Sequence, residues 1–257
     1  MMDKNQMIDC VRGQLALDYN CSPDDFMKDG IFFTEAVNKE GRRSYPWRSP
    51  RIEMIAMGNS MIINASNDIM PLVRKQFKGH LREEILCLPF FYGINIYYLP
   101  DVDKIVQLEK PTEFEYKWFE KSDLSQINKL KGFGYVLGGS SVELVIAAIH
   151  NGKIVGMAGT KADCEKMRVV NVDVLKKYRN KGIATALVNM LTLEVLNRGF
   201  IPYYFTGSSN TASLHTAVKA GYFPAWVHTY KAMTESKSLF GRMKNNLRIK
   251  LKRIMQL

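Results

Sequence analysis

One stretch constrains the fold more than any other part of the sequence: VDVLKKYRNKGIA, from Val172 to Ala184. It predicts a β-branched strand, a short basic turn and a helix, because apolar residues recur at helical spacing from Gly182 to Asn197. Backbone amides at a helix start have no partner within the helix and lie at the positive end of its dipole. A strand that turns tightly into a helix therefore suits the binding of a phosphate group.

The side chains of this turn fit the same interpretation. Gly182 and Ala184 carry little or no side chain, so phosphate oxygens could approach the backbone closely. Arg179 and Lys181 add positive charge beside it. The pattern R-x-x-G-x-A is weak on its own, because an ordinary strand-to-helix turn also produces it.

The order of the predicted elements around the turn strengthens its interpretation as a phosphate-binding turn. Asn151-Gly152 is a strong hairpin signal. The second half of the chain predicts, in order, a strand over 113–119, a helix over 122–131, a loose glycine-rich run over 132–139, and strands over 142–149, 153–160 and 167–174. A helix over 182–197, a strand over 201–206, a helix over 211–220 and a strand over 226–232 follow. The first half predicts helices over 6–19, from 22 and over 68–86, and strands over 31–37, 52–57, 61–65 and 94–99.

Three segments in this order resemble the GNAT superfamily of N-acetyltransferases. IAAIHNGKIVGMAGT is similar to the family's second and third strands, DVLKKYRNKGIATALV to its acyl-CoA motif, and NTASLHTAVKAGYFPAW to its N-x-x-A/S … G-F segment. The likeness spans about residues 111–232, and it is greatest to uncharacterised bacterial members with an N-terminal α+β extension. The resemblance implies an α+β fold with a GNAT-type mixed, splayed β-sheet flanked by helices, preceded by a small α+β domain.

The resemblance also implies which residues would bind acetyl-CoA. Backbone groups of Val172 and Val174 would contact the pantetheine arm, and Asn210 would contact it from the next strand. The pyrophosphate would be bound by the amides of the turn, which belong to Arg179, Asn180, Lys181, Gly182, Ile183 and Ala184.

The proton-transfer residues are less well indicated. Many family members carry a tyrosine as general acid four residues before the glycine of the G-F pair, and here that position is Ala217. Tyr222, Tyr230, His215 or a water molecule remain alternatives, and Tyr222 is the candidate we name. Asp173 is the candidate base; the alternative is that it holds a neighbouring loop.

We expect three regions: an N-terminal α+β domain (1–110), an acyltransferase domain (111–233) and a basic amphipathic helix (234–257). The net charge is +11, and the last region holds seven basic residues against one acidic residue. Such a helix either docks on its own protein, which we favour, or binds an anionic membrane. A loop over 39–51 with four arginines is interpreted as solvated rather than as a phosphate grip.

Neither a secretory signal nor a membrane-spanning run is evident, so the sequence predicts a cytoplasmic protein. The four cysteines lack metal-type spacing, which predicts reduced, mostly buried thiols and no metal site. The favoured function is acetyl transfer from acetyl-CoA to a primary amine of a small molecule or a peptide. The alternatives are a non-catalytic acyl-CoA-binding module, and a basic protein that associates with membrane or nucleic acid without a dedicated nucleic-acid fold.

Overall fold

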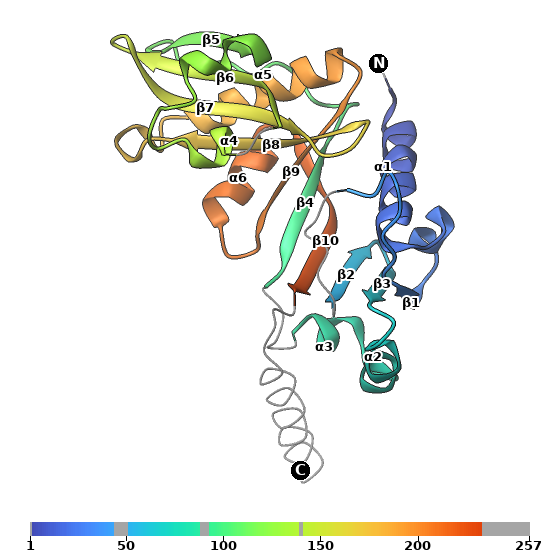
Figure 1. Cartoon of the computed structure of the whole chain (residues 1–257). Helices are drawn as coiled ribbons and strands as arrows, with labels where there is room; N and C mark the ends of the chain where they lie inside the picture. Colours follow the sequence, from blue (N-terminus) through green and yellow to red (C-terminus); the bar gives the residue numbers. More distant parts are fainter. Residues whose placement is uncertain (1, 44–50, 88–92, 139–140, 233–257) are drawn as a thin grey trace.

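The computed structural model describes residues 2–43, 51–87, 93–138 and 141–232. Within them ten strands form one mixed sheet, in the order β1-β3-β2-β10-β4-β9-β8-β7-β6-β5 (Figure 1). The strands are β1 (Gly30–Glu35), β2 (Arg51–Met57), β3 (Ser60–Ala65), β4 (Asn95–Pro100), β5 (Glu115–Glu120), β6 (Val142–His150), β7 (Lys153–Ala162), β8 (Met167–Val174), β9 (Ile201–Gly207) and β10 (Tyr222–Ala232). The α-helices are α1 (Lys4–Tyr19), α2 (Met70–Phe77), α3 (Arg82–Leu86), α4 (Gly134–Leu137), α5 (Ile183–Asn197) and α6 (Thr211–Lys219).

The predicted elements of the second half are confirmed from the β6–β7 hairpin onward. Asn151 and Gly152 form the turn with φ of 50° and 68°, the left-handed conformation that a two-residue hairpin needs. Gly199 has φ 79° just past the end of α5, where a residue in this conformation commonly stops a helix. This half has the predicted α+β arrangement, in which helices flank a mixed sheet.

The sheet runs without a break between the two halves of the chain. β4 lies between β9 and β10 and is antiparallel to both of them. β10 in turn pairs with β2, so a strand from the end of the described chain lies between two early ones. The boundary that we expect at residue 110 remains a prediction, and the sheet crosses it.

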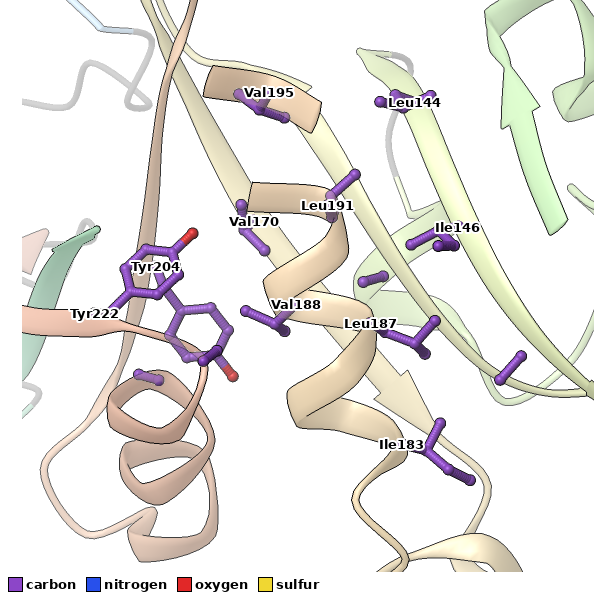
Figure 2. Packing of buried hydrophobic residues seen from close by; sticks show 14 of the residues in the cluster. Leu144, Ile146, Val170, Ile183, Leu187, Val188, Leu191, Val195, Tyr204 and Tyr222 are labelled. Atoms are coloured by element: carbon purple, nitrogen blue, oxygen red, sulfur yellow. The ribbon is translucent and has the colours of Figure 1, made fainter. Parts of the chain in front are cut away.

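Helices cover both faces of the sheet (Figure 1). On one face α5 and α6 bury a core that includes Leu187, Leu191 and Val195, which pack against Val170 of β8 (Figure 2). On the other face Met7, Val11 and Leu15 of α1 pack against Ile55, Ile62, Tyr97 and Tyr203. Successive side chains of each strand point to opposite faces of the sheet, as the two-residue period of a β-strand requires.

The expectation that the arginine loop over 39–51 is solvated is wrong for the arginines that the structure describes. Residues 44–50, with Arg48, lie outside the described residues, but Arg42, Arg43 and Arg51 are buried rather than solvated. Arg43 pairs with Asp18 of α1 at 2.5 Å, and both side chains are at most 2% exposed. A buried guanidinium persists only with such a partner. The sequence could not reveal the pairing, because the partners are distant in the chain.

The segment between β5 and β6 also differs from what the sequence predicts. We expect a helix over 122–131 followed by a loose, glycine-rich run. Instead a 3-10 helix, η2 (Lys121–Gln126), begins after Glu120, whose amide donates to the Asp123 carboxylate at 3.3 Å, and the glycine-rich run contains the short helix α4. The remaining 3-10 helices are η1 (Pro23–Met27), at the predicted helix start, and η3 (Lys176–Tyr178).

Candidate functional site

The strands β8 and β9 are hydrogen-bonded neighbours over only part of their lengths. They pair in parallel at three positions, the last of which joins Val169 to Tyr203. Beyond this position β8 continues beside β7 as far as Val174, whereas β9 pairs with β4 from Tyr204 to Gly207. We call this point the fork. It leaves one backbone edge of β8 without a strand partner.

Backbone groups of Val172 and Val174 lie on that edge. The amide of Leu175 donates to the Val155 carbonyl of β7 at 2.9 Å. Backbone groups of successive residues in an antiparallel ladder alternate between the two sides. Those of Asp173 therefore point toward β7, and those of Val172 and Val174 point toward the side that β9 has left. Backbone groups of both residues are therefore on the open edge, and their contact with pantetheine remains a prediction.

The helix α5 begins directly beside the end of β8. Gly182 precedes it with φ 77°, a conformation that favours glycine, and its carbonyl accepts the first helical hydrogen bond from Ala186. The amides of Ile183 and Ala184 are in the first turn, where a helix supplies no acceptor. Asn180 also has positive φ, 62°, so the turn presents consecutive amides at the positive end of the α5 dipole.

A second glycine brings α5 close to the sheet. A Cβ atom built on Gly156 of β7 would lie 2.9 Å from Cγ2 of Ile183 and 3.4 Å from Cγ2 of Val174. Real Cβ contacts are almost never as short as 2.9 Å, so only glycine fits between the start of α5 and the end of β8 without a shift of Ile183. The position of the turn amides relative to the fork therefore depends on Gly156.

Two basic side chains of the turn flank these amides. Arg179 donates from Nε to the Val174 carbonyl at 3.0 Å, which places its guanidinium at the open edge of β8. Lys181 Nζ lies 3.0 Å from Glu113 Oε1, with both side chains about half exposed. An exposed pair of this kind contributes little to stability, so Lys181 can exchange its partner for a ligand phosphate at low cost.

Asn210 lies across the fork, beyond the end of β9. Its side-chain oxygen accepts from the Ser213 amide at 3.3 Å and caps α6. Its own amide donates to the Gly207 carbonyl at 2.9 Å. The predicted contact with pantetheine remains a prediction; the observed role of the side chain is to begin α6.

Asp173 is placed on the face opposite α5. One carboxylate oxygen accepts from the amides of Tyr135 and Val136 at 2.9 and 3.0 Å, which are the first amides of α4. Of the two roles considered for Asp173, these bonds favour holding a neighbouring segment. Its role as a base has no contact that supports it.

Tyr222 is in the core rather than at the open edge. It is 4% exposed, and its hydroxyl shares a 2.6 Å hydrogen bond with Thr192 of α5. Burial raises the pKa of this phenol well above its ordinary value. These contacts favour packing over proton transfer. Ala217, at the position of the family's tyrosine, is fully buried in the same core cluster.

A tyrosine whose backbone lies next to the fork was not singled out from the sequence. Tyr204 is the first residue of β9 beyond the last β8 pair, and its hydroxyl lies 2.7 Å from Ser213 Oγ of α6. Its ring packs beside Tyr222, next to α6 (Figure 2). A signal existed: alternation along IPYYFTG places Tyr204 on the opposite face from Tyr203, toward the helices.

The described residues contain no group of three or more His, Cys, Asp or Glu that could hold a metal ion. Among them, no helix has both the length and the apolar character needed to cross a bilayer. The four cysteines form no disulfide; three are partly buried, whereas Cys87 is exposed, contrary to our expectation of mostly buried thiols.

Comparison with known proteins agrees with this architecture. The family model for GNAT acetyltransferases matches residues 101–233, slightly more than half of the chain. No curated protein sequence matches. Among solved structures, a GCN5-related N-acetyltransferase from Sphaerobacter thermophilus is 15% identical, with TM-score 0.45 and coverage of 70% of this chain and 59% of that one.

Two further structures are similar in fold. A GCN5-related N-acetyltransferase-like protein from Streptococcus suis has 17% identity, TM-score 0.42, and coverage of 67% of this chain and 72% of its own. An acetyltransferase of the GNAT family from Colwellia psychrerythraea has 16% identity, TM-score 0.43, and coverage of 61% and 63% respectively.

Proposed function

Because the chain belongs to the GNAT acetyltransferase family, we propose that it transfers an acetyl group from acetyl-CoA to a primary amine of a small molecule or peptide. The observation that carries the proposal is the fork, where an unpartnered edge of β8 meets the amide-rich start of α5. An extended ligand with a pyrophosphate at one end matches these two features.

Two parts of acetyl-CoA, the pyrophosphate and the pantetheine arm, then have partners in the chain. The turn amides from Arg179 to Ala184 bind the pyrophosphate, and Arg179 and Lys181 add charge–charge attraction. On the edge of β8 that has no strand partner, the backbone groups of Val172 and Val174 bind the pantetheine arm as a neighbouring strand would; the Val174 carbonyl also accepts from Arg179 Nε. These contacts support the binding of acetyl-CoA, and they do not depend on which acceptor receives the acetyl group.

The chemistry needs few groups beyond this. A neutral amine attacks the thioester carbonyl, a C–N bond forms, the C–S bond breaks, and the electron pair leaves on sulfur. A backbone amide at the open edge of β8 stabilises the negative oxygen of the intermediate. The thiol that leaves has an ordinary pKa near 8.5 as a free cysteine-like group, so modest assistance suffices.

Titration calorimetry with acetyl-CoA tests the proposal. We expect saturable binding that Gly182→Glu abolishes, because a carboxylate at the start of α5 repels the pyrophosphate and blocks the turn. Gly199→Glu is the matched control: Gly199 has nearly the same φ, 79° against 77°, and lies at the other end of the same helix. It should bind acetyl-CoA like the natural chain.

Absence of binding at millimolar acetyl-CoA, or equal effects of the two glutamates, would contradict the assignment. The buried alanine at position 217 motivates a second candidate, a non-catalytic acyl-CoA-binding module. It predicts binding with no release of CoA for any amine in a broad panel, which a thiol-detecting assay reads directly.

The remaining expectations stay proposals. The basic helix over 234–257 lies outside the described residues, so its docking or membrane contact is tested by vesicle retention with and without these residues. A cytoplasmic location also remains a prediction. The amine acceptor is open among small molecules and peptides, and a CoA-release screen of amine libraries would identify it.

A further inference from the structure

A cavity of about 270 Å³ lies where the start of α1 meets the end of α5, and no residue assigned a role above lines it. Figure 1 shows α1 beginning beside the end of α5. The walls come from three parts of the chain: the start of α1, the turn after β4 and the connection from α5 to β9. The apolar side chains that line the cavity are Met2, Met7, Val102, Leu196, Phe200 and Ile201.

The walls of the cavity are held in place by the fold. Met7 and Ile201 are at most 2% exposed and belong to the core cluster that α1 forms with the sheet. Gly199, with φ 79°, reverses the chain between α5 and β9. The Arg168 guanidinium lies 3.9 Å from the ring centroid of Phe200. Protein interiors contain few voids larger than a water molecule, so a cavity of this size between fixed walls is a candidate ligand site.

The charges around the cavity favour an uncharged ligand. Among the described residues, Asn197 provides the one polar side chain of the lining, and it is exposed. Asp101, which adjoins Val102, already pairs with Lys4 at 3.0 Å. Arg198, which adjoins Asn197, already pairs with two carboxylates. A charged ligand would therefore lose its hydration in the cavity without gaining a partner from these groups.

We propose that this cavity binds a small uncharged molecule with an apolar body of one or two rings, and that Asn197 bonds to its single polar group. An engineered apolar cavity of about 150 Å³ takes up benzene, so this larger one accommodates a larger body. Met2 and Met7 suit such a ligand, because methionine adapts its shape and contacts aromatic rings favourably.

The proposed site is independent of the acyltransferase function. α5 has 15 residues, so its two ends are about 20 Å apart. Gly182 and the turn amides lie at one end, and the cavity lies at the other. The ligand therefore does not compete with acetyl-CoA. Because it contacts both α1 and the end of α5, it stabilises the packing of the first half of the chain against the second.

Methionine methyl signals test the proposal, with indole as the probe. Nuclear magnetic resonance spectra of the full chain, labelled with carbon-13 at the methionine methyl groups, are recorded as indole is added. Met2→Leu and Met7→Leu assign the two signals from the cavity. We expect both signals to shift saturably, whereas Met54, which is buried in the core cluster beside α2, should not move. Indole-2-carboxylate, the same ring system with a negative charge, should bind about tenfold more weakly or less.

Two matched variants locate the binding. Val102→Phe places a ring in the cavity and should weaken indole binding about tenfold. Val106→Phe adds the same ring in the same connection, at a position that is 65% exposed and does not line the cavity, and should leave binding unchanged. Should Val102→Phe not fold, Met2→Trp fills the cavity from a residue that precedes the cap of α1, and the Met7 signal reports binding.

Four results would overturn the proposal. Indole could leave both methyl signals unmoved up to its solubility limit, or the two phenylalanine variants could bind it equally. Equal binding of indole-2-carboxylate would contradict the uncharged class of ligand. Shifts of Met2 and Met7 that follow the protein concentration rather than indole would assign the cavity to a second copy of the chain.

Discussion

Asp173 and Lys161 hold opposite ends of the same short helix. The carboxylate of Asp173 accepts from the first amides of α4, and Lys161 Nζ donates to the carbonyls of Tyr135, at 3.0 Å, and Gly138. Negative charge thus lies at the amide end of α4 and positive charge at its carbonyl end, which is the favourable arrangement for a helix dipole. Four residues are too few to form a helix without such support.

Asp173→Ala should therefore release α4. We expect the free energy of unfolding to fall by about 1.5–3 kcal/mol, the range for hydrogen bonds to a charged group. Hydrogen exchange at the amides of Tyr135 and Val136 should become faster. Glu165→Ala, an exposed acidic residue, is the control. Unchanged exchange at both amides would show that α4 does not depend on Asp173.

Gly156→Ala and Gly13→Ala should have opposite effects on stability. The new methyl group at Gly156 would meet Ile183 at 2.9 Å and push the start of α5 from the sheet, which lowers both stability and acetyl-CoA affinity. Gly13 lies inside α1 with nothing within 4 Å, so alanine should stabilise by about 0.5–1 kcal/mol. Urea unfolding and calorimetry measure both. Equal signs would contradict the packing described for Gly156.

His228 should make the protein sensitive to acid. It is buried between α1 and β4, and burial, with repulsion from Arg43 and Arg51, lowers its pKa from 6.5 to about 3. Between these values the unfolded chain binds a proton that the folded chain does not, so stability falls as the pH drops from about 7 toward 3.

Urea unfolding at pH 7 and pH 5 checks this expectation. From pH 7 to pH 5 the natural chain should lose about 2 kcal/mol more than His228→Phe does. Other groups that titrate in this pH range contribute to both proteins and cancel in this difference. An equal loss in the two proteins would mean that His228 takes up its proton in the folded state.

Residues 111–257 expressed alone should not fold cooperatively. Without β4, neither β9 nor β10 has its partner on one edge, and Tyr203 and Asp163 lose their shared neighbour Arg43. We expect a broad, non-cooperative thermal transition by near-ultraviolet circular dichroism. A sharp transition together with acetyl-CoA binding would instead establish residues 111–257 as a unit that folds independently of residues 1–110.

Local signals explain why most of the second half could be predicted. The Asn151–Gly152 turn and the apolar spacing of α5 are encoded in adjacent residues, and the structure confirms both. The turn at Gly182 could likewise be predicted, because a position with positive φ favours glycine and glycine is visible in the sequence. The strand, turn and helix start that lie beside the fork could therefore be predicted from the sequence, whereas their contact with acetyl-CoA remains a prediction.

The features that could not be predicted depend on distant partners. Helix α4 exists because Lys161 and Asp173 are on strands that follow it in sequence, and no local propensity announces it. The burial of Arg43 depends in the same way on Asp18. Tyr204 was not singled out because its place beside the fork depends on where β9 leaves β8, which is a property of strand pairing rather than of any motif.

The place of β10 in the sheet has a consequence for how the chain is made. Its neighbours β2 and β4 belong to the first hundred residues, whereas β10 is synthesised more than a hundred residues later. During translation these early strands have open edges that could pair with another chain. The sheet can therefore close only after β10 has been synthesised, so the fold is completed late in translation. Slow translation of the second half prolongs the time during which the edges of β2 and β4 are exposed.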